Sequence, residues 1–193
     1  MTEFIFIRHG QTDENKKKHI QGRRDIPLNS CGEGQALQCA KYLHDKGYSF
    51  DAIYSSPLSR AYKTAEIIND YTKANLKIIK DDGFIERCFG VKEGCNVCHE
   101  VFKEINDDSA PGLEKSYEVR ERVIGEVLRL AKQYDGKKIL VITHSHTIKA
   151  LTTFCNPDKY RFEDRLCNCS LSIFEVSNDV ISLKNFNIET IVD

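Results

Sequence analysis

The chain has 193 residues, of which 40% are hydrophobic, and its 28 Lys and Arg nearly balance 29 Asp and Glu. This length suits one compact domain, and the composition is typical of a folded protein rather than a disordered or fibrous one. A net charge of −1 excludes a strong overall field for nucleic acid or an anionic membrane. The longest apolar runs, 4–7 and 139–142, are far shorter than the roughly 20 residues that cross a bilayer, so we expect no membrane span.

The first residues lack the basic and apolar regions of an export signal, and we therefore expect a cytoplasmic protein. In that compartment the eight cysteines are expected to be free thiols. Cys95, Cys98 and His99 also match the spacing of a haem-attachment motif, but haem attachment requires export. A zinc site would need four thiolates, from Cys95, Cys98, Cys167 and Cys169. The sequence does not show that these segments meet, and the role of these four cysteines stays open.

Strand and helix signals alternate along the whole chain without a repeat or a linker, which predicts a single catalytic domain over 1–193. Residues 3–7 and 138–143 form continuous apolar runs, as expected for strands buried on both faces of a parallel sheet. Two shorter strands are predicted at 51–54 and 76–79.

Three helices are predicted from apolar residues at helical spacing. The first follows Gly32, and its inward positions are Ala36, Leu37, Ala40 and Leu43. The second has Ser56 as N-cap and Pro57 at its first position, which places Arg60 in its first turn. Its buried stripe is Leu58, Ala61, Ala65 and Ile68. The third covers 116–134.

A carboxyl-terminal hairpin is predicted from 171–176 and 180–186, turning at Asn178 and Asp179. Strand and helix units that alternate before such an edge hairpin favour an α/β fold. We expect a three-layer α/β/α sandwich around a mixed, mostly parallel sheet.

Both apolar strands end at a histidine, His9 in the first and His144 in the second. Ligands of open α/β sheets bind beyond the carboxyl ends of the strands, so we expect the two imidazoles to meet there. Arg8 beside His9, and Arg60 in the first turn of a helix at the same edge, add two guanidinium groups. Such cations repel one another unless an anion completes the cluster, and phosphate matches the paired donors of guanidinium. The sequence therefore predicts a phosphoryl-binding pocket.

The motifs around these residues follow one another in a distinctive order. Residues 8–12 read Arg-His-Gly-Gln-Thr, and 21–28 contain Gln-Gly followed by Asp-x-Pro-Leu. Residues 55–61 read Ser-Ser-Pro-Leu-Ser-Arg-Ala, 86–94 form a glutamate-containing loop, and 141–144 read Val-Ile-Thr-His. The chain resembles, over nearly its whole length, the histidine phosphatase superfamily in its phosphoglycerate-mutase-like branch.

The resemblance implies that His9 is the nucleophile and accepts the phosphoryl group on Nε2, its other ring nitrogen being held by a backbone carbonyl of the following turn. Arg8, Arg60 and His144 would hold the oxygens of the transferred group. Glu86 would give a proton to the leaving oxygen. The resemblance implies neither a metal nor another cofactor.

The substrate-binding residues that the resemblance implies are Thr12, Asn15, Gln21, Gly22 and Ser145. The chain departs from the family after His144, where members often have two glycines and this chain has Ser145 and His146. This departure counts more against mutase activity than against phosphatase chemistry.

We therefore expect a phosphomonoester hydrolase that acts through phosphohistidine on a small phosphorylated metabolite. One alternative is a cofactor-dependent phosphoglycerate mutase, although the resembling mutases are typically longer. Another is a non-catalytic phospholigand-binding protein, which predicts a damaged nucleophile or acid, whereas His9 and Glu86 are both present. The substrate, whose specificity would come from 87–115, stays open, as does the choice between monomer and homodimer; neither nucleic acid nor a membrane is expected as a partner.

Overall fold

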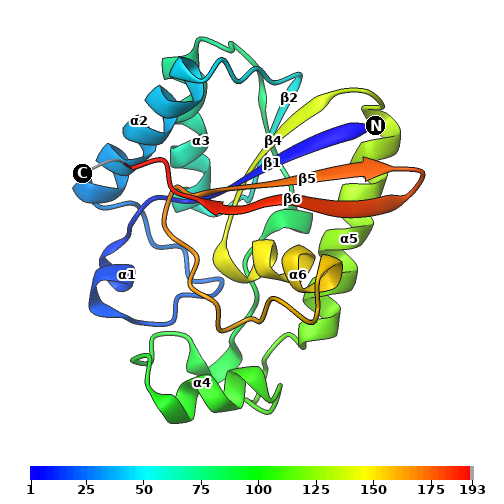
Figure 1. The fold of residues 1–193 in the computed structure, drawn as a ribbon. Helices are drawn as coiled ribbons and strands as arrows, with labels where there is room; N and C mark the ends of the chain where they lie inside the picture. The colour runs from blue at the N-terminus through cyan, green and yellow to red at the C-terminus, as the bar shows by residue number, and fades with distance from the viewer. Residues whose placement is uncertain (192–193) are drawn as a thin grey trace.

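Six strands form one sheet in the computed structural model, which describes residues 1–191 (Figure 1). The strands are β1 (Thr2–Arg8), β2 (Ala52–Ser55), β3 (Ile78–Lys80), β4 (Lys138–Thr143), β5 (Leu171–Ser177) and β6 (Val180–Ile188). Their order is β3-β2-β4-β1-β5-β6; β1, β2, β3 and β4 pair in parallel, whereas β5 is antiparallel to both its neighbours, β1 and β6. The prediction of a mixed, mostly parallel sheet is confirmed.

Helices cover both faces of this sheet. One layer holds α2 (Ser30–Asp45) and α3 (Ser59–Thr72), and the other holds α5 (Ser116–Gln133) and α6 (Ser145–Cys155). Alternate residues of β1 enter the two cores: Phe4 and Phe6 pack with α5 and α6, whereas Ile5 and Ile7 pack with α2 and α3. Because both faces are buried, β1 is apolar throughout its middle, and the predicted three-layer sandwich is confirmed.

The remaining short elements lie in loops beyond the sheet. They are α1 (Asp13–Lys17), the 3-10 turns η1 (Asp82–Phe84) and η2 (Gly90–Lys92), and α4 (His99–Asn106). Residues 88–115, here named the cap segment, carry α4 and a small core of their own, formed by Phe89, Ile105, Ala110 and Leu113. Figure 1 shows α4 at the bottom, below α1 and α6.

Three local predictions need correction. Helix α3 begins at Ser59 rather than at Pro57, because Leu58 has extended backbone angles (φ −65°, ψ 136°) and is itself the N-cap residue. Leu37 does not face inward but is 49% exposed, because the buried stripe of α2 runs through positions 36, 39, 40 and 43. Helix α6 has no counterpart among the predicted helices.

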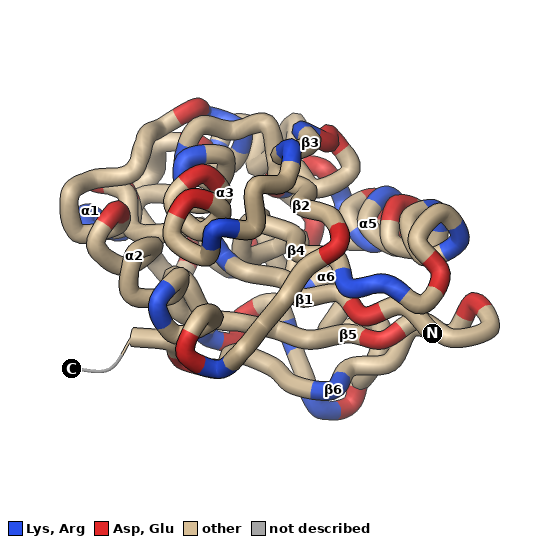
Figure 2. Tube along the Cα trace, turned by 90° about the horizontal axis from the view of Figure 1, so that it is seen from above, with Lys and Arg blue, Asp and Glu red and all other residues tan. Residues whose placement is uncertain are grey.

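The distribution of charged residues and the state of the cysteines can be read from the structure. Figure 2 shows acidic and basic residues interspersed along the chain. No helix within 1–191 has the length and apolar character needed to span a membrane. All eight cysteines lie in this described part and are free thiols. Within it, no three Cys, His, Asp or Glu side chains are grouped as metal ligands, so the four-thiolate zinc alternative is not supported.

Candidate active site

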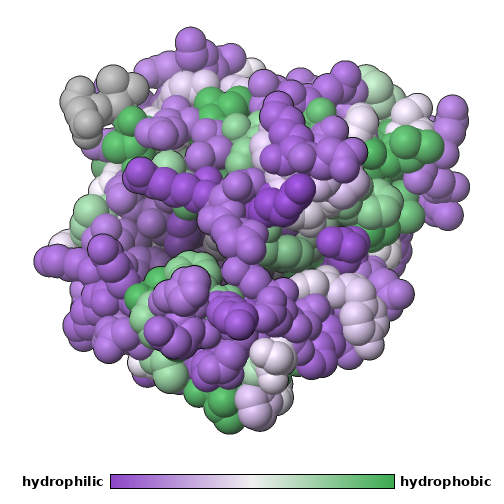
Figure 3. All heavy atoms as spheres, turned by 60° about the horizontal axis from the view of Figure 1, so that its bottom comes forward, coloured by the Kyte–Doolittle hydropathy of each residue, from purple (hydrophilic) through white to green (hydrophobic). Residues whose placement is uncertain are grey.

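A cavity of about 440 Å³ lies at the carboxyl ends of β1 and β4, between α1, α6 and the cap segment. Figure 3 shows a hollow on this face, rimmed by hydrophilic side chains. Eight of the ten sequence-predicted site residues line the cavity: Arg8, His9, Asn15, Gln21, Gly22, Arg60, Glu86 and Ser145. Thr12 and His144 lie behind its wall and contact residues that line it.

His9 follows β1 and is fixed through both its backbone and its ring. Its backbone N–H donates to Thr143 at 2.9 Å, which continues the pairing of β1 with β4. Its Nδ1 lies 2.7 Å from the Gly10 carbonyl oxygen. A carbonyl can only accept, so Nδ1 carries the proton and Nε2 keeps its lone pair. Burial and the charges of Arg60 and Arg8 hold the pKa of His9 well below its usual value, which keeps the imidazole neutral.

Gly10 allows the nucleophile loop to approach α2. A Cβ atom at Gly10 would lie 2.3 Å from the backbone oxygen of Gly32 near the start of that helix. The backbone N–H of Gly10 also donates to the Thr64 hydroxyl of α3 at 3.2 Å. The glycine after His9 is therefore required by close backbone packing between the loop and α2.

Two guanidinium groups face the cavity from different elements. Arg60, 1% exposed in the first turn of α3, donates to the carbonyl oxygens of Arg24 at 2.8 Å and Gly22 at 2.7 Å. Arg8 donates to the carbonyl oxygen of Leu166. Within 1–191 neither arginine forms an ion pair, and the Nε atom of each is buried without a hydrogen-bond partner. Burial lowers the pKa of Arg60 to about 10, so its charge persists at neutral pH.

His144 is the N-cap residue of α6 and lies beside the nucleophile. The centroids of the His9 and His144 rings are 5.1 Å apart. Its Nε2 lies 2.7 Å from the Ser56 Oγ, and its buried Nδ1 has no partner in the described residues. Burial, followed by Arg60, lowers the pKa of His144 well below its usual value. The structure thus brings both predicted imidazoles and Arg60 to one edge of the sheet.

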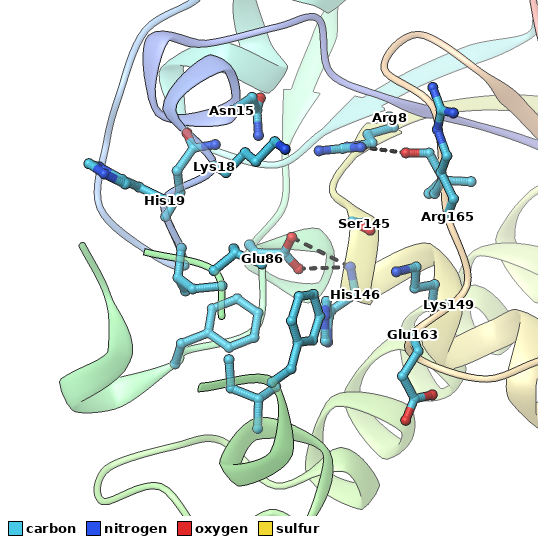
Figure 4. A pocket seen from close by; sticks show the side chains of 18 of the residues that line it. Arg8, Asn15, Lys18, His19, Glu86, Ser145, His146, Lys149, Glu163 and Arg165 are labelled. Atoms are coloured by element: carbon cyan, nitrogen blue, oxygen red, sulfur yellow. Dashed lines mark hydrogen bonds between the residues drawn. The ribbon is translucent and has the colours of Figure 1, made fainter. Parts of the chain in front are cut away.

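Glu86 points toward the start of α6 (Figure 4). Its Oε1 accepts hydrogen bonds from the backbone N–H groups of Arg87 at 2.9 Å and His146 at 3.2 Å. Its Oε2 has only a 3.5 Å contact with the N–H of His146. The carboxyl is 6% exposed and lines the cavity. Oε2 is therefore the oxygen better placed to carry and release a proton.

Thr12 organises two amides of the cavity wall. The Thr12 hydroxyl caps α1 by accepting from the Asn15 N–H at 3.1 Å, and it donates to Gln21 Oε1 at 2.9 Å. Asn15 Oδ1 accepts from the Thr12 N–H at 3.2 Å. Since both amide oxygens are engaged, the NH₂ groups of Asn15 and Gln21 are the parts available to an anion.

The cavity wall holds seven further polar residues: Lys18, His19, His146, Lys149, Glu163, Asp164 and Arg165. Of these, sequence reasoning named only His146, as part of the departure from the family after His144. Lys149 on α6 is 7% exposed, and its Nζ donates to the Phe162 carbonyl oxygen at 2.8 Å. Burial, together with the charge of Arg8, lowers the pKa of Lys149 to about 8. The sequence held one signal for Lys149. It lies four positions after Ser145, and residues three or four positions apart in a helix share one face.

Comparison with known proteins identifies the family of this chain. The model of the histidine phosphatase superfamily (branch 1) matches residues 4–189. A Bacillus subtilis protein described as uncharacterized phosphatase PhoE is 38% identical over 191 residues, which cover 98% of this chain and 96% of the relative. Phosphoserine phosphatase from Entamoeba histolytica, solved with 3-phosphoglyceric acid, is 30% identical with a TM-score of 0.82, and the match covers 97% of each chain. Phosphoglycerate mutase from Bacillus anthracis shares the fold, with a TM-score of 0.86 at 21% identity over 98% of this chain and 94% of the mutase. The chain therefore belongs to the histidine phosphatase superfamily and is an enzyme of that superfamily.

Proposed function

We propose that this enzyme hydrolyses small phosphomonoesters through a phosphohistidine formed on His9. The observation that carries the proposal is the bond from His9 Nδ1 to the Gly10 carbonyl oxygen, which leaves Nε2 as the nucleophilic nitrogen. The guanidinium groups of Arg8 and Arg60, which line the cavity and form no ion pair in the described residues, supply donors for the phosphoryl oxygens.

In the first step the Nε2 lone pair of His9 bonds to phosphorus while the bond between phosphorus and the ester oxygen breaks. Glu86, protonated on Oε2, gives its proton to the departing oxygen, which leaves as an alcohol. Arg8, Arg60 and His144 stabilise the charge on the three remaining phosphoryl oxygens. The imidazole becomes phosphohistidine, and Glu86 becomes a carboxylate.

In the second step water replaces the alcohol. The Glu86 carboxylate takes a proton from the water, whose oxygen bonds to phosphorus as the bond between phosphorus and His9 Nε2 breaks. Inorganic phosphate leaves, the imidazole is neutral again, and Glu86 is protonated for the next cycle. Every proton that Glu86 gives is recovered from water, so the cycle needs no other reactant.

Two features support a small, freely diffusing substrate in the cytoplasm. The net charge of −1 provides no strong overall field for nucleic acid. Eight free thiols in the described residues fit a reducing compartment. The names of PhoE and of the amoebal phosphoserine phosphatase support hydrolysis of a phosphomonoester over transfer to a second bound molecule.

The test is release of inorganic phosphate from p-nitrophenyl phosphate in the presence of a chelator. We expect turnover by the native protein, a loss of at least about 1,000-fold in His9→Ala, and no change in His44→Ala, whose imidazole is exposed on α2. Acid-labile phosphate trapped on the native protein would identify the intermediate. Full turnover by His9→Ala contradicts the mechanism, and interconversion of phosphoglycerates without phosphate release would favour a mutase.

A further inference from the structure

Lys18 holds an unusual backbone conformation at the rim of the cavity. It is the C-cap residue of α1, with φ 59° and ψ 45°, in the left-handed region. Glycine and asparagine enter this region readily, whereas the Cβ of a lysine is strained against its own backbone. Residues held in this way cluster at functional sites, where the surrounding structure fixes them.

The surroundings of Lys18 fix its backbone on both sides. Its N–H donates to the carbonyl oxygen of Asn15 at 3.1 Å, and its own carbonyl accepts from Val97 of the cap segment at 2.8 Å. Figure 4 shows the result: the Lys18 amine extends across the cavity toward the guanidinium of Arg8. The left-handed conformation thus belongs to a turn that directs a cation into the cavity.

The ammonium of Lys18 has no carboxylate partner in the described part of the chain. The carboxylate of Glu14, four positions before Lys18, pairs with other residues. It lies 3.2 Å from His19, 3.3 Å from Arg24 and 3.8 Å from Lys17. Arg8 likewise forms no ion pair within 1–191. Two unpaired cations that face each other across one cavity repel, and an anion between them removes that repulsion.

We propose that Lys18 is a further substrate-binding residue, whose ammonium binds the phosphoryl group from the side opposite Arg8. The inference rests on the proposed function, because the anion is the substrate of that reaction. Lys18 is exposed at the cavity rim, so it binds the substrate and the transition state alike, and its loss raises KM while kcat stays nearly unchanged.

Lys73 provides a matched control. It is also an exposed lysine at a helix C-cap in the left-handed region, with φ 52° and ψ 32° after α3, but it does not line the cavity. Lys18→Gly and Lys73→Gly therefore remove the same charge and relieve the same backbone strain. We expect both variants to raise Tm by about 2 °C.

The two variants should differ in phosphate binding. We expect Lys18→Gly alone to raise KM for p-nitrophenyl phosphate and the inhibition constant of inorganic phosphate by about tenfold each, with kcat within about twofold. Lys18→Arg, which keeps the charge, should stay within about threefold of the native values. Equal constants in Lys18→Gly and Lys73→Gly would overturn the proposal while leaving the hydrolase function intact.

The proposal can also be tested without turnover. Calorimetric titration of inorganic phosphate into the native protein and into Lys18→Gly measures the same contact directly. About tenfold weaker binding by the variant supports a phosphate-binding Lys18 even where p-nitrophenyl phosphate is not hydrolysed, a result that would contradict the hydrolase function alone. Equal affinity of the two proteins for phosphate overturns the role of Lys18.

Discussion

The Nε2 of His144 lies 2.7 Å from the Oγ of Ser56, and both side chains are completely buried. Ser56 directly follows β2, and His144 directly follows β4, the neighbouring strand. The same Ser56 Oγ accepts a hydrogen bond from the Leu58 N–H at 3.3 Å. The contact therefore ties the start of α3 to the start of α6 and fixes the ring of His144 beside His9.

Removal of this contact should slow the reaction without weakening substrate binding. In Ser56→Ala the His144 ring loses its partner and samples orientations that do not support the transferred group. We expect kcat to fall about tenfold, the size of one lost neutral hydrogen bond, with KM nearly unchanged. Ser55→Ala is the control, because Ser55 is equally buried and donates to the Ser56 carbonyl oxygen at 2.8 Å without contacting His144. Equal losses in both variants would assign the effect to packing.

Glu86→Gln separates proton transfer from the binding contacts of the carboxyl. Glutamine keeps an oxygen that can accept from the N–H groups of Arg87 and His146, but it has no proton to give. For an alkyl phosphate, whose alcohol is a poor leaving group, we expect kcat/KM to fall by about 1,000-fold. For p-nitrophenyl phosphate, whose leaving group needs little protonation, the loss should stay within about tenfold. Equal losses for both substrates would remove Glu86 from the role of acid.

The sequence predicted strand β4 correctly but gave no sign of helix α6. Strand β4 occupies the predicted range 138–143, because a continuous apolar run is what burial on both faces requires. Helix α6 escaped prediction because its buried residues include Lys149, Thr152 and Thr153. Such a helix, packed between the sheet and a polar cavity, has no purely apolar stripe from which its period can be recognised.

The same distinction holds within the site. His9 and Arg60 lie at the end of a strand and at the start of a helix, and sequence signals define both places. Lys18 and Lys149 depend on a left-handed turn and on the face of an unpredicted helix, so their approach to the cavity required the structure. Loop geometry and polar burial, rather than motif spacing, place these two lysines at the cavity wall.

His146 should make stability sensitive to acid. Its ring lies between Phe89 and Phe162, with centroid distances of 4.9 Å and 5.2 Å, and burial lowers its pKa well below the usual value. As pH falls below about 6.5 the unfolded chain takes up a proton that the folded protein refuses, so the free energy of unfolding falls by about 1.4 kcal/mol per pH unit for this group.

Replacement of His146 by phenylalanine tests this contribution. His146→Phe keeps an aromatic ring between Phe89 and Phe162 and leaves the backbone N–H for Glu86. Urea unfolding measures how much the free energy of unfolding falls between pH 7.0 and about 5.0. This fall should be roughly 2 kcal/mol smaller in His146→Phe than in the native protein. His44→Phe, at an exposed position, should follow the native protein, and the same pH dependence in all three would contradict the buried neutral state of His146.

Lys149 should make stability rise with pH as well, but at alkaline pH. The folded protein holds its pKa near about 8, against 10.5 for a free lysine, mainly because the ammonium is buried and secondarily because Arg8 repels it. Between these two values the unfolded chain keeps a proton that the folded protein has released, so stability rises with pH across this window. A shift of this size corresponds to roughly 3 kcal/mol over the whole window.

In Lys149→Met the side chain keeps its length but has no proton to lose, so the alkaline rise in stability should disappear. Lys132→Met serves as control, because Lys132 is 70% exposed on α5 and its loss changes net charge equally. Urea unfolding at pH 7.5 and 9.5 compares the three proteins, and the difference between the variant and native pH slopes isolates the contribution of Lys149. Parallel slopes in the native protein and Lys149→Met would mean that the buried ammonium carries no desolvation cost.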